Sequence, residues 1–212
     1  MKEIQIRKND AGQRLDRFVG KAVPLLPESL LQKYIRLKRI KRNGKSAKRD
    51  VRLVEGDVLQ LYINDEFFER PTEENAWLKI ATPRLDIVYE DENILLADKK
   101  PGVLCHSAGE WSWDTLISNI QAYLRQSGEW DPKAENAFTP ALCNRIDRNT
   151  GGIVIAAKNA EALRILNDKI RDREIDKAYL CVVCGRPKPA EGRLEGYLFC
   201  LLYTSPSRRD LS

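Results

Sequence analysis

The sequence is poor in the residues that support metal binding and histidine-based catalysis. Its 212 residues include a single histidine, which argues against most His-ligated metals and Ser–His–Asp triads. It also has no apolar run near the roughly 20 residues that a membrane-spanning helix needs. The five cysteines are an odd number and are scattered from Cys105 to Cys200, as reduced thiols are. We therefore expect a cytoplasmic protein without a resident metal.

What the sequence has in excess is positive charge near its N-terminus. Residues 1–64 contain 16 Lys/Arg and 7 Asp/Glu, whereas residues 65–212 contain 20 and 24. The segment from Lys33 to Arg52 contains ten basic residues and only one acidic residue, Asp50. A solvated helix face is the ordinary explanation of a charge run. Here the repulsion is almost uncompensated, which favours a polyphosphate partner and predicts nucleic-acid binding.

Residues 1–64 have the pattern of a small module of two helices and a hairpin. Apolar spacing predicts the helices, and Asn-Gly is a strong hairpin signal. Residues 65–84, with acidic clusters and two prolines, indicate a linker. The expected elements, in chain order, are a helix at 14–22, a helix at 30–37 capped by Ser29, turns at Asn43-Gly44 and Gly56-Asp57, and a strand at 58–63.

Residues 85–200 alternate strands with helices, which predicts an α+β domain built on a mixed sheet. The apolar run at 153–157 predicts a buried strand. The expected elements are strands at 86–89, 93–99, 153–157 and 177–184, a helix at 115–126 capped by Asp114, and a helix capped by Asn159 that carries Leu163, Leu166 and Ile170.

The stretch from Asn144 to Gly152 is the most unusual in the chain. It places Asp147 between Arg145 and Arg148, in a loop that ends in two glycines before an apolar strand. Two guanidinium groups would lower the pKa of this carboxyl and keep it ionised, as a nucleophile or an electrostatic role requires. A structural ion pair in a turn is the competing interpretation, because surface Asp–Arg pairs are common.

Residues 145–155 strongly resemble the catalytic motif of the RluA-type pseudouridine synthases of large-subunit ribosomal RNA. Asn144 and Gly151 differ from the family's usual histidine and serine. Two further stretches match in the right order. Residues 98–106 look like the family's Lys-Pro-x-Gly-x-x-x-His element, and residues 177–185 look like its Lys-x-Tyr-x-x-x-x-x-Gly strand. The resemblance covers roughly residues 12–199.

The resemblance implies that the protein isomerises uridine to pseudouridine in RNA, without cofactor or metal. The expected substrate is large-subunit ribosomal RNA. Asp147 is then the catalytic residue, as nucleophile or base. Arg145 would contact the flipped nucleotide and Tyr179 would stack on the uracil, so both are expected to bind substrate. The protein is expected to work as a monomer.

The N-terminal module is similar to S4-type RNA-binding domains, with residues 14–18 matching their opening helix and residues 40–45 their hairpin. Lys38 stands where many members have glycine. The residues expected to bind RNA are Arg36, Lys38, Arg39, Lys41, Arg42 and Lys45.

Residues 201–212 match no element of the family and look foreign to it. The sequence therefore predicts an RNA-binding domain at 1–64, a linker at 65–84, a partial catalytic domain at 85–200 and a foreign-looking tail at 201–212, as in a C-terminally truncated fragment. The alternatives are an RNA-binding protein without catalysis, in which Asp147 is an ion-paired turn residue, and a hydrolase with Asp147 as nucleophile. The lack of a second catalytic carboxylate or histidine nearby disfavours the hydrolase.

Overall fold

A computed structural model describes residues 1–68, 76–107 and 113–193. These residues form two four-stranded sheets, with strand orders β1-β4-β2-β3 and β5-β6-β8-β7, and every pairing in them is antiparallel. The α+β class is confirmed, but the mixed sheet expected at residues 85–200 is not found in the described part of that range. Among the described residues, no helix is long and apolar enough to cross a membrane. The tail at 201–212 lies outside the described residues, as do residues 69–75 of the expected linker.

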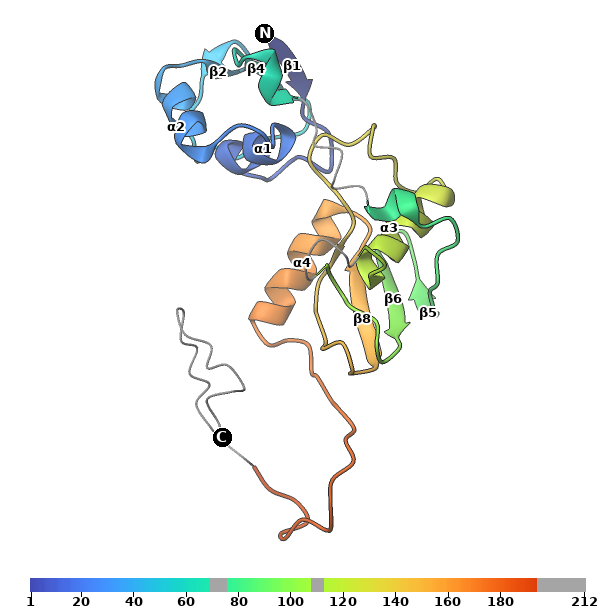
Figure 1. The fold of residues 1–212 in the computed structure, drawn as a ribbon. Coiled ribbons are helices and arrows are strands. Elements are labelled where there is room, and N and C mark those ends of the chain that lie inside the picture. The colour runs from blue at the N-terminus through green and yellow to red at the C-terminus, as the bar shows by residue number, and fades with distance from the viewer. Residues whose placement is uncertain (69–75, 108–112, 194–212) are drawn as a thin grey trace, which may run out of the picture. The chain divides into compact units, whose positions relative to one another are not determined.

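The first sheet and two helices enclose one apolar core (Figure 1). Leu15, Phe18 and Val19 turn inward from the first helix, at the spacing of one helical face. Leu59 and Leu61 alternate inward from strand β4. The elements are β1 (Lys2–Gln5), α1 (Leu15–Ala22), α2 (Glu28–Arg36), β2 (Ile40–Arg42), β3 (Lys45–Ser46) and β4 (Val58–Leu61).

Helix α2 ends in a left-handed residue, Lys38, at φ 59°. The Lys38 N–H donates to the Ile35 carbonyl (3.0 Å) and the Arg39 N–H to the Tyr34 carbonyl (2.9 Å). This pair of bonds is the Schellman motif, whose left-handed position usually holds glycine. Lys38 therefore adopts the turn conformation that glycine usually adopts, and its charged side chain lies just after the C-terminus of α2.

The second sheet is covered on one face by helix α3 (Leu116–Gln126). Leu95 and Ala97 of β6 and Val154 and Ala156 of β8 are buried with α3, while Ile153 is 45% exposed. The expected strand at 153–157 is confirmed, with Val154, Ala156 and Ala157 buried and Ile153 exposed. The other elements are two 3₁₀ turns (Asp65–Phe68 and η3, Ala76–Lys79), β5 (Ile87–Glu90), β6 (Ile94–Lys99), β7 (Ala141–Leu142), β8 (Gly152–Ala157) and α4 (Ala160–Arg171).

Two of the three expected helix caps are wrong. Pro27 precedes α2, and no side chain caps that helix, because it starts at Glu28, before Ser29. Thr115 rather than Asp114 caps α3, accepting the Ser118 N–H. The cap of α4 is confirmed, since the Asn159 side chain accepts the Ala162 N–H at 2.9 Å.

The strand expected at 177–184 is not formed in the described residues. Residues 176–212 make up a separate unit, in which Leu180 and Val182 are fully exposed. A strand needs a neighbour to pair its backbone groups, and the described residues of this unit form no strand. The strand predicted at 177–184 therefore has no paired strand among the described residues.

Asp57 holds the hairpin of the N-terminal module in place. Its carboxylate accepts the Val54 N–H and the Asn43 amide, each at 2.8 Å, and it pairs with the Arg42 guanidinium at 2.6 Å. Burial alone would raise the pKa of Asp57, but the hydrogen bonds from Val54, Arg42 and Asn43 lower it below its usual value. The Asn43-Gly44 turn is confirmed, with φ of 51° and 77°.

We predict that Asp57→Asn lowers the free energy of unfolding by about 1–3 kcal/mol at pH 7, because it weakens a buried acceptor for three donors. The folded-state pKa is lowered, so the carboxylate's contribution is complete above the unfolded pKa of about 3.9 and is lost as pH falls through the folded value. Urea unfolding of both proteins should give a constant difference from pH 5 to 8 that shrinks below about pH 4. Asp50→Asn, at an exposed position, is the control. An equal loss in both variants would contradict this role.

Candidate functional site

The loop that carries Asp147 leaves the same end of the second sheet as the loop at 100–106. Strands β6 and β8 pair antiparallel, with Lys99 opposite Gly152 (Figure 1). The end of β6 therefore lies beside the start of β8, which brings together two motifs that are about 40 residues apart in the chain.

The ammonium group of Lys99 ties these loops together. Lys99 is 1% exposed, and its Nζ donates to the carbonyls of Lys100 (3.2 Å), Val103 (2.9 Å) and Arg148 (3.0 Å). An ammonium has three donors, and each has a backbone acceptor here. No carboxylate is paired with it among the described residues. A buried charge without such acceptors would be strongly unfavourable, so the loops and the lysine fix one another.

Close backbone contacts continue from this lysine toward Asp147. The Gly102 N–H donates to the Arg148 carbonyl (2.8 Å), and Arg148 Nε donates back to the Gly102 carbonyl (3.0 Å). A Cβ atom on Gly151 would lie 3.1 Å from Pro101 Cδ, so a larger residue there requires Pro101 to shift by a few tenths of an ångström. The Thr150 N–H donates to the Asp147 carbonyl (3.1 Å) and closes the turn.

The Asp147 side chain is exposed and has no ion pair among the described residues. Neither flanking arginine forms an ion pair with it in the part of the chain that the structure describes. Arg148 is directed to the Gly102 carbonyl instead. An ion-paired turn residue, the competing interpretation, does not describe Asp147 either, because its carboxylate stays accessible on a fixed backbone.

Arg145 lies near His106 of the neighbouring loop. The pKa of His106 is lowered, first by its partial burial and second by the positive charge of Arg145, so the imidazole is neutral at pH 7. Arg145 is itself exposed. The loop thus presents a cation and a carboxylate to solvent, two residues apart.

Tyr179, the third residue expected at the site, lies in the separate unit 176–212. Its side chain is 61% exposed, in a segment without secondary structure. Among the described residues, no cluster of three His, Cys, Asp or Glu side chains is arranged to hold a metal.

Three of the six residues expected to bind RNA line one open hollow of about 540 Å³ in the first module. Lys38, Arg39 and Lys41 surround it together with Tyr62. Lys41 Nζ lies 5.2 Å from the centre of the Tyr62 ring, a cation–π contact. Arg36 and Lys45 are exposed nearby in the chain. Arg42 differs from the others because its guanidinium forms an ion pair with Asp57 within the module. Its charge is therefore less available to RNA.

Sequence reasoning missed Lys99 and Tyr62. Lys99 lies within residues 98–106, which resemble a family motif. A lysine at the end of a predicted strand is usually exposed, so the sequence does not indicate that its side chain is buried. Tyr62 lies within the strand predicted at 58–63, and an aromatic residue close to a basic segment is the signal that would have found it.

Comparison with known proteins gives a consistent result. The family model "RNA pseudouridylate synthase" matches residues 93–204. An uncharacterised RNA pseudouridine synthase of Mycoplasma genitalium is 31% identical over 85% of this chain and 55% of its own length. Ribosomal large subunit pseudouridine synthase C of Rickettsia bellii is 30% identical over 86% of this chain and 59% of its own.

The chain thus spans a little over half the length of these curated relatives. The solved structure of human RNA Pseudouridylate Synthase Domain Containing 4 is 20% identical, with a TM-score of 0.34, and the match covers 48% of this chain and 34% of that one.

We predict that Lys99→Met loosens both loops, because it leaves three backbone carbonyls without their common donor. The expected loss is about 2–4 kcal/mol of unfolding free energy. Hydrogen exchange at the Gly102 amide should also become faster. Lys100→Met is the matched control: this neighbour pairs with Asp86 and Asp98 at the surface, and its loss should change exchange at Gly102 little. Unchanged exchange in Lys99→Met would contradict the role of Lys99.

Proposed function

The chain belongs to the RNA pseudouridylate synthase family, and from that premise we propose that it isomerises uridine to pseudouridine in RNA, with Asp147 as the catalytic residue. The observation that carries the proposal is the state of Asp147. Its carboxylate is exposed and without an ion pair among the described residues, on a backbone that Lys99 holds in place. Such a carboxylate can interact with a substrate, because it does not form an ion pair within the described part of the protein.

The reaction needs no atom from outside the substrate and water. The glycosidic bond from C1′ to N1 breaks, the uracil rotates, and C1′ forms a new bond to C5. The proton on C5 leaves and N1 gains one, so the reaction is redox-neutral. An ionised carboxylate beside an extruded base suits attack on the ribose, attack on the base, or abstraction of the C5 proton.

We assign substrate binding to Arg145 and Tyr179. Arg145 is exposed two residues before Asp147, where a guanidinium can contact the RNA backbone beside the flipped nucleotide. Tyr179 offers an exposed ring, as stacking on a uracil requires.

We further propose that the N-terminal module is an S4-like domain that holds the RNA. The hollow at Lys38, Arg39 and Lys41 combines three cations with the Tyr62 ring, as phosphate contact and base stacking together require. Large-subunit ribosomal RNA is the proposed substrate, because the Rickettsia bellii relative carries that name. We place this activity in the cytoplasm.

Asp147→Asn keeps the shape of the side chain and removes its charge. We predict that it abolishes tritium release from RNA labelled at uridine C5 and leaves RNA affinity nearly unchanged. The assay uses the 212-residue chain, with the whole Rickettsia bellii relative run beside it, because the match covers 59% of that protein. Asp168→Asn on α4 is the control.

A variant that keeps more than about a tenth of the activity, a barrier change under roughly 1.4 kcal/mol, would exclude Asp147 as an essential nucleophile or base. Tight RNA binding by the unsubstituted proteins without any release would favour the alternative of an RNA-binding protein without catalysis.

The basic hollow makes a separate prediction about salt. Replacing Lys38, Arg39 and Lys41 together with Gln should weaken RNA binding and reduce the slope of log affinity against log salt by about 2–3, because fewer counterions are released. Fluorescence anisotropy from 50 to 300 mM KCl measures this slope. The matched control replaces Lys169, Arg171 and Arg173 on and after α4 with Gln. An equal change of slope in both triple variants would show that only net charge matters.

A further inference from the structure

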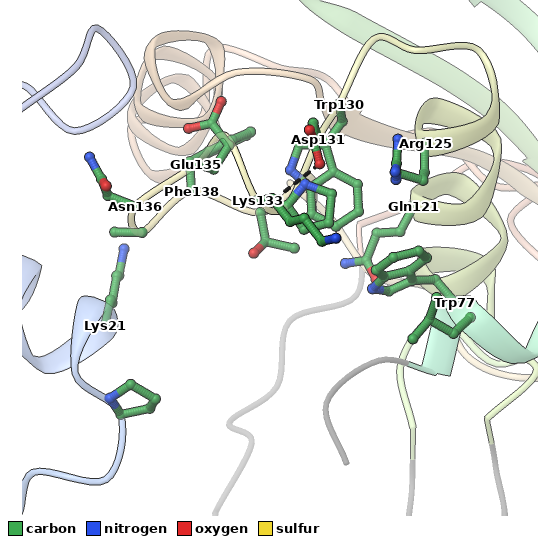
Figure 2. Close-up of a pocket in the computed structure, with 15 residues that line it drawn as sticks. Lys21, Trp77, Gln121, Arg125, Trp130, Asp131, Lys133, Glu135, Asn136 and Phe138 are labelled. Atoms are coloured by element: carbon green, nitrogen blue, oxygen red, sulfur yellow. Dashed lines mark hydrogen bonds between the residues drawn. The ribbon is translucent and has the colours of Figure 1, made fainter. Parts of the chain in front are cut away.

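A second hollow, of about 670 Å³, lies where η3, α3 and the segment at 130–139 meet (Figure 2). Its lining includes three aromatic residues and three polar or charged ones from this half of the chain. They are Trp77, Trp130, Phe138, Gln121, Arg125 and Lys133. None of the residues assigned above to catalysis or RNA binding lines it.

The turn after α3 places Trp130 in this hollow. Gly128 takes φ of 80°, and the N–H groups of Glu129 and Trp130 both donate to the Leu124 carbonyl (3.0 and 3.1 Å). The chain is thereby folded back on the helix end. The Trp130 ring meets the Trp77 ring edge-on, with ring centres 5.5 Å apart.

The indole N–H of Trp130 is buried without a partner. The side chain is 5% exposed, and Nε1 has no acceptor among the described residues. A buried donor without an acceptor is unfavourable, and buried Trp N–H groups usually have one. Because Nε1 is buried, a carbonyl oxygen of a ligand would accept this N–H only after the indole turns toward the hollow.

The charged groups around the hollow favour an anionic ligand. Asp131 accepts the backbone N–H of Lys133 at 3.1 Å (Figure 2), and Glu135 accepts the Asn9 amide at 2.7 Å. Arg125 and Lys133 are exposed, and neither side chain has an ion pair among the described residues. Both carboxylates keep their charge, but the three cations Lys21, Arg125 and Lys133 outnumber them around the hollow.

We propose that this hollow binds one unstacked nucleotide of RNA, outside the catalytic site. The base lies against the indoles and its carbonyl oxygen accepts the Trp130 N–H, while the phosphate is held by Arg125 and Lys133. The hollow exceeds the size of one nucleotide and is open enough for the strand to enter and leave. This inference rests on the proposed RNA substrate and extends it to a second contact.

The test uses full-length chain labelled with 5-fluorotryptophan, whose ¹⁹F signals are assigned by single Trp→Phe variants. Uridine 5′-monophosphate at millimolar concentration should shift the Trp77 and Trp130 signals and leave the Trp113 signal in place. Heptauridylate should shift the same two signals at lower concentration. Inorganic tripolyphosphate is the probe for charge alone and should not reproduce the shifts.

Arg125→Gln, at the end of α3, should weaken nucleotide binding about threefold to tenfold, as loss of one charged hydrogen bond implies. Arg171→Gln at the end of α4 is its matched control. Trp130→Phe should weaken binding by a similar factor while its unfolding midpoint shows that the core is intact. Arg125→Gln keeps the test valid if Trp130→Phe does not fold.

Equal shifts with tripolyphosphate would overturn a nucleotide site. RNA bound tightly, as seen by anisotropy, without movement of either tryptophan signal would overturn the site and leave the proposed function standing. Shifts with uridine monophosphate in a chain that lacks synthase activity would support the pocket and count against the catalytic proposal alone.

Discussion

One buried ammonium group decides the geometry of the candidate active site. Lys99 Nζ donates to three carbonyls, two from the loop that follows β6 and one from Arg148. The buried ammonium would be strongly unfavourable without these acceptors, so both loops are held in the positions that supply them. The lysine therefore converts two irregular segments into one fixed surface, from which Asp147 and Arg145 reach solvent. Strand pairing between β6 and β8 supplies the framework, and Lys99 supplies the connection across it.

The sequence predicted those parts of the fold that depend on interactions between residues close in the chain. The Asn43-Gly44 turn follows from backbone conformations that these two residues tolerate. The Asn159 cap follows from a side chain that bonds its own helix. The strand at 153–157 follows from an apolar run, although the run did not reveal that Ile153 stays exposed. The S4-like assignment and the domain boundaries stay predictions.

The parts that sequence missed depend on neighbours far away in the chain. The strand expected at 177–184 has the right residues, but no described strand pairs with it. Arg42 looks like any other basic residue until Asp57 is placed beside it. Arg148 is adjacent to Asp147 in the sequence, yet its guanidinium donates to the Gly102 carbonyl of the neighbouring loop. Local spacing shows which charges are present, and long-range packing decides which of them remain available.

The central claim is that Asp147 stands free on a fixed loop so that it can meet a uridine. The most direct measurement is the ¹³C resonance of the Asp147 carboxyl, assigned with Asp147→Asn in aspartate-labelled protein, during titration with a short RNA. An RNA that contains one accessible uridine should move this resonance, and the same RNA with cytidine at that position should bind while moving it far less. An Asp147 resonance that stays in place while the uridine RNA is fully bound would contradict the claim.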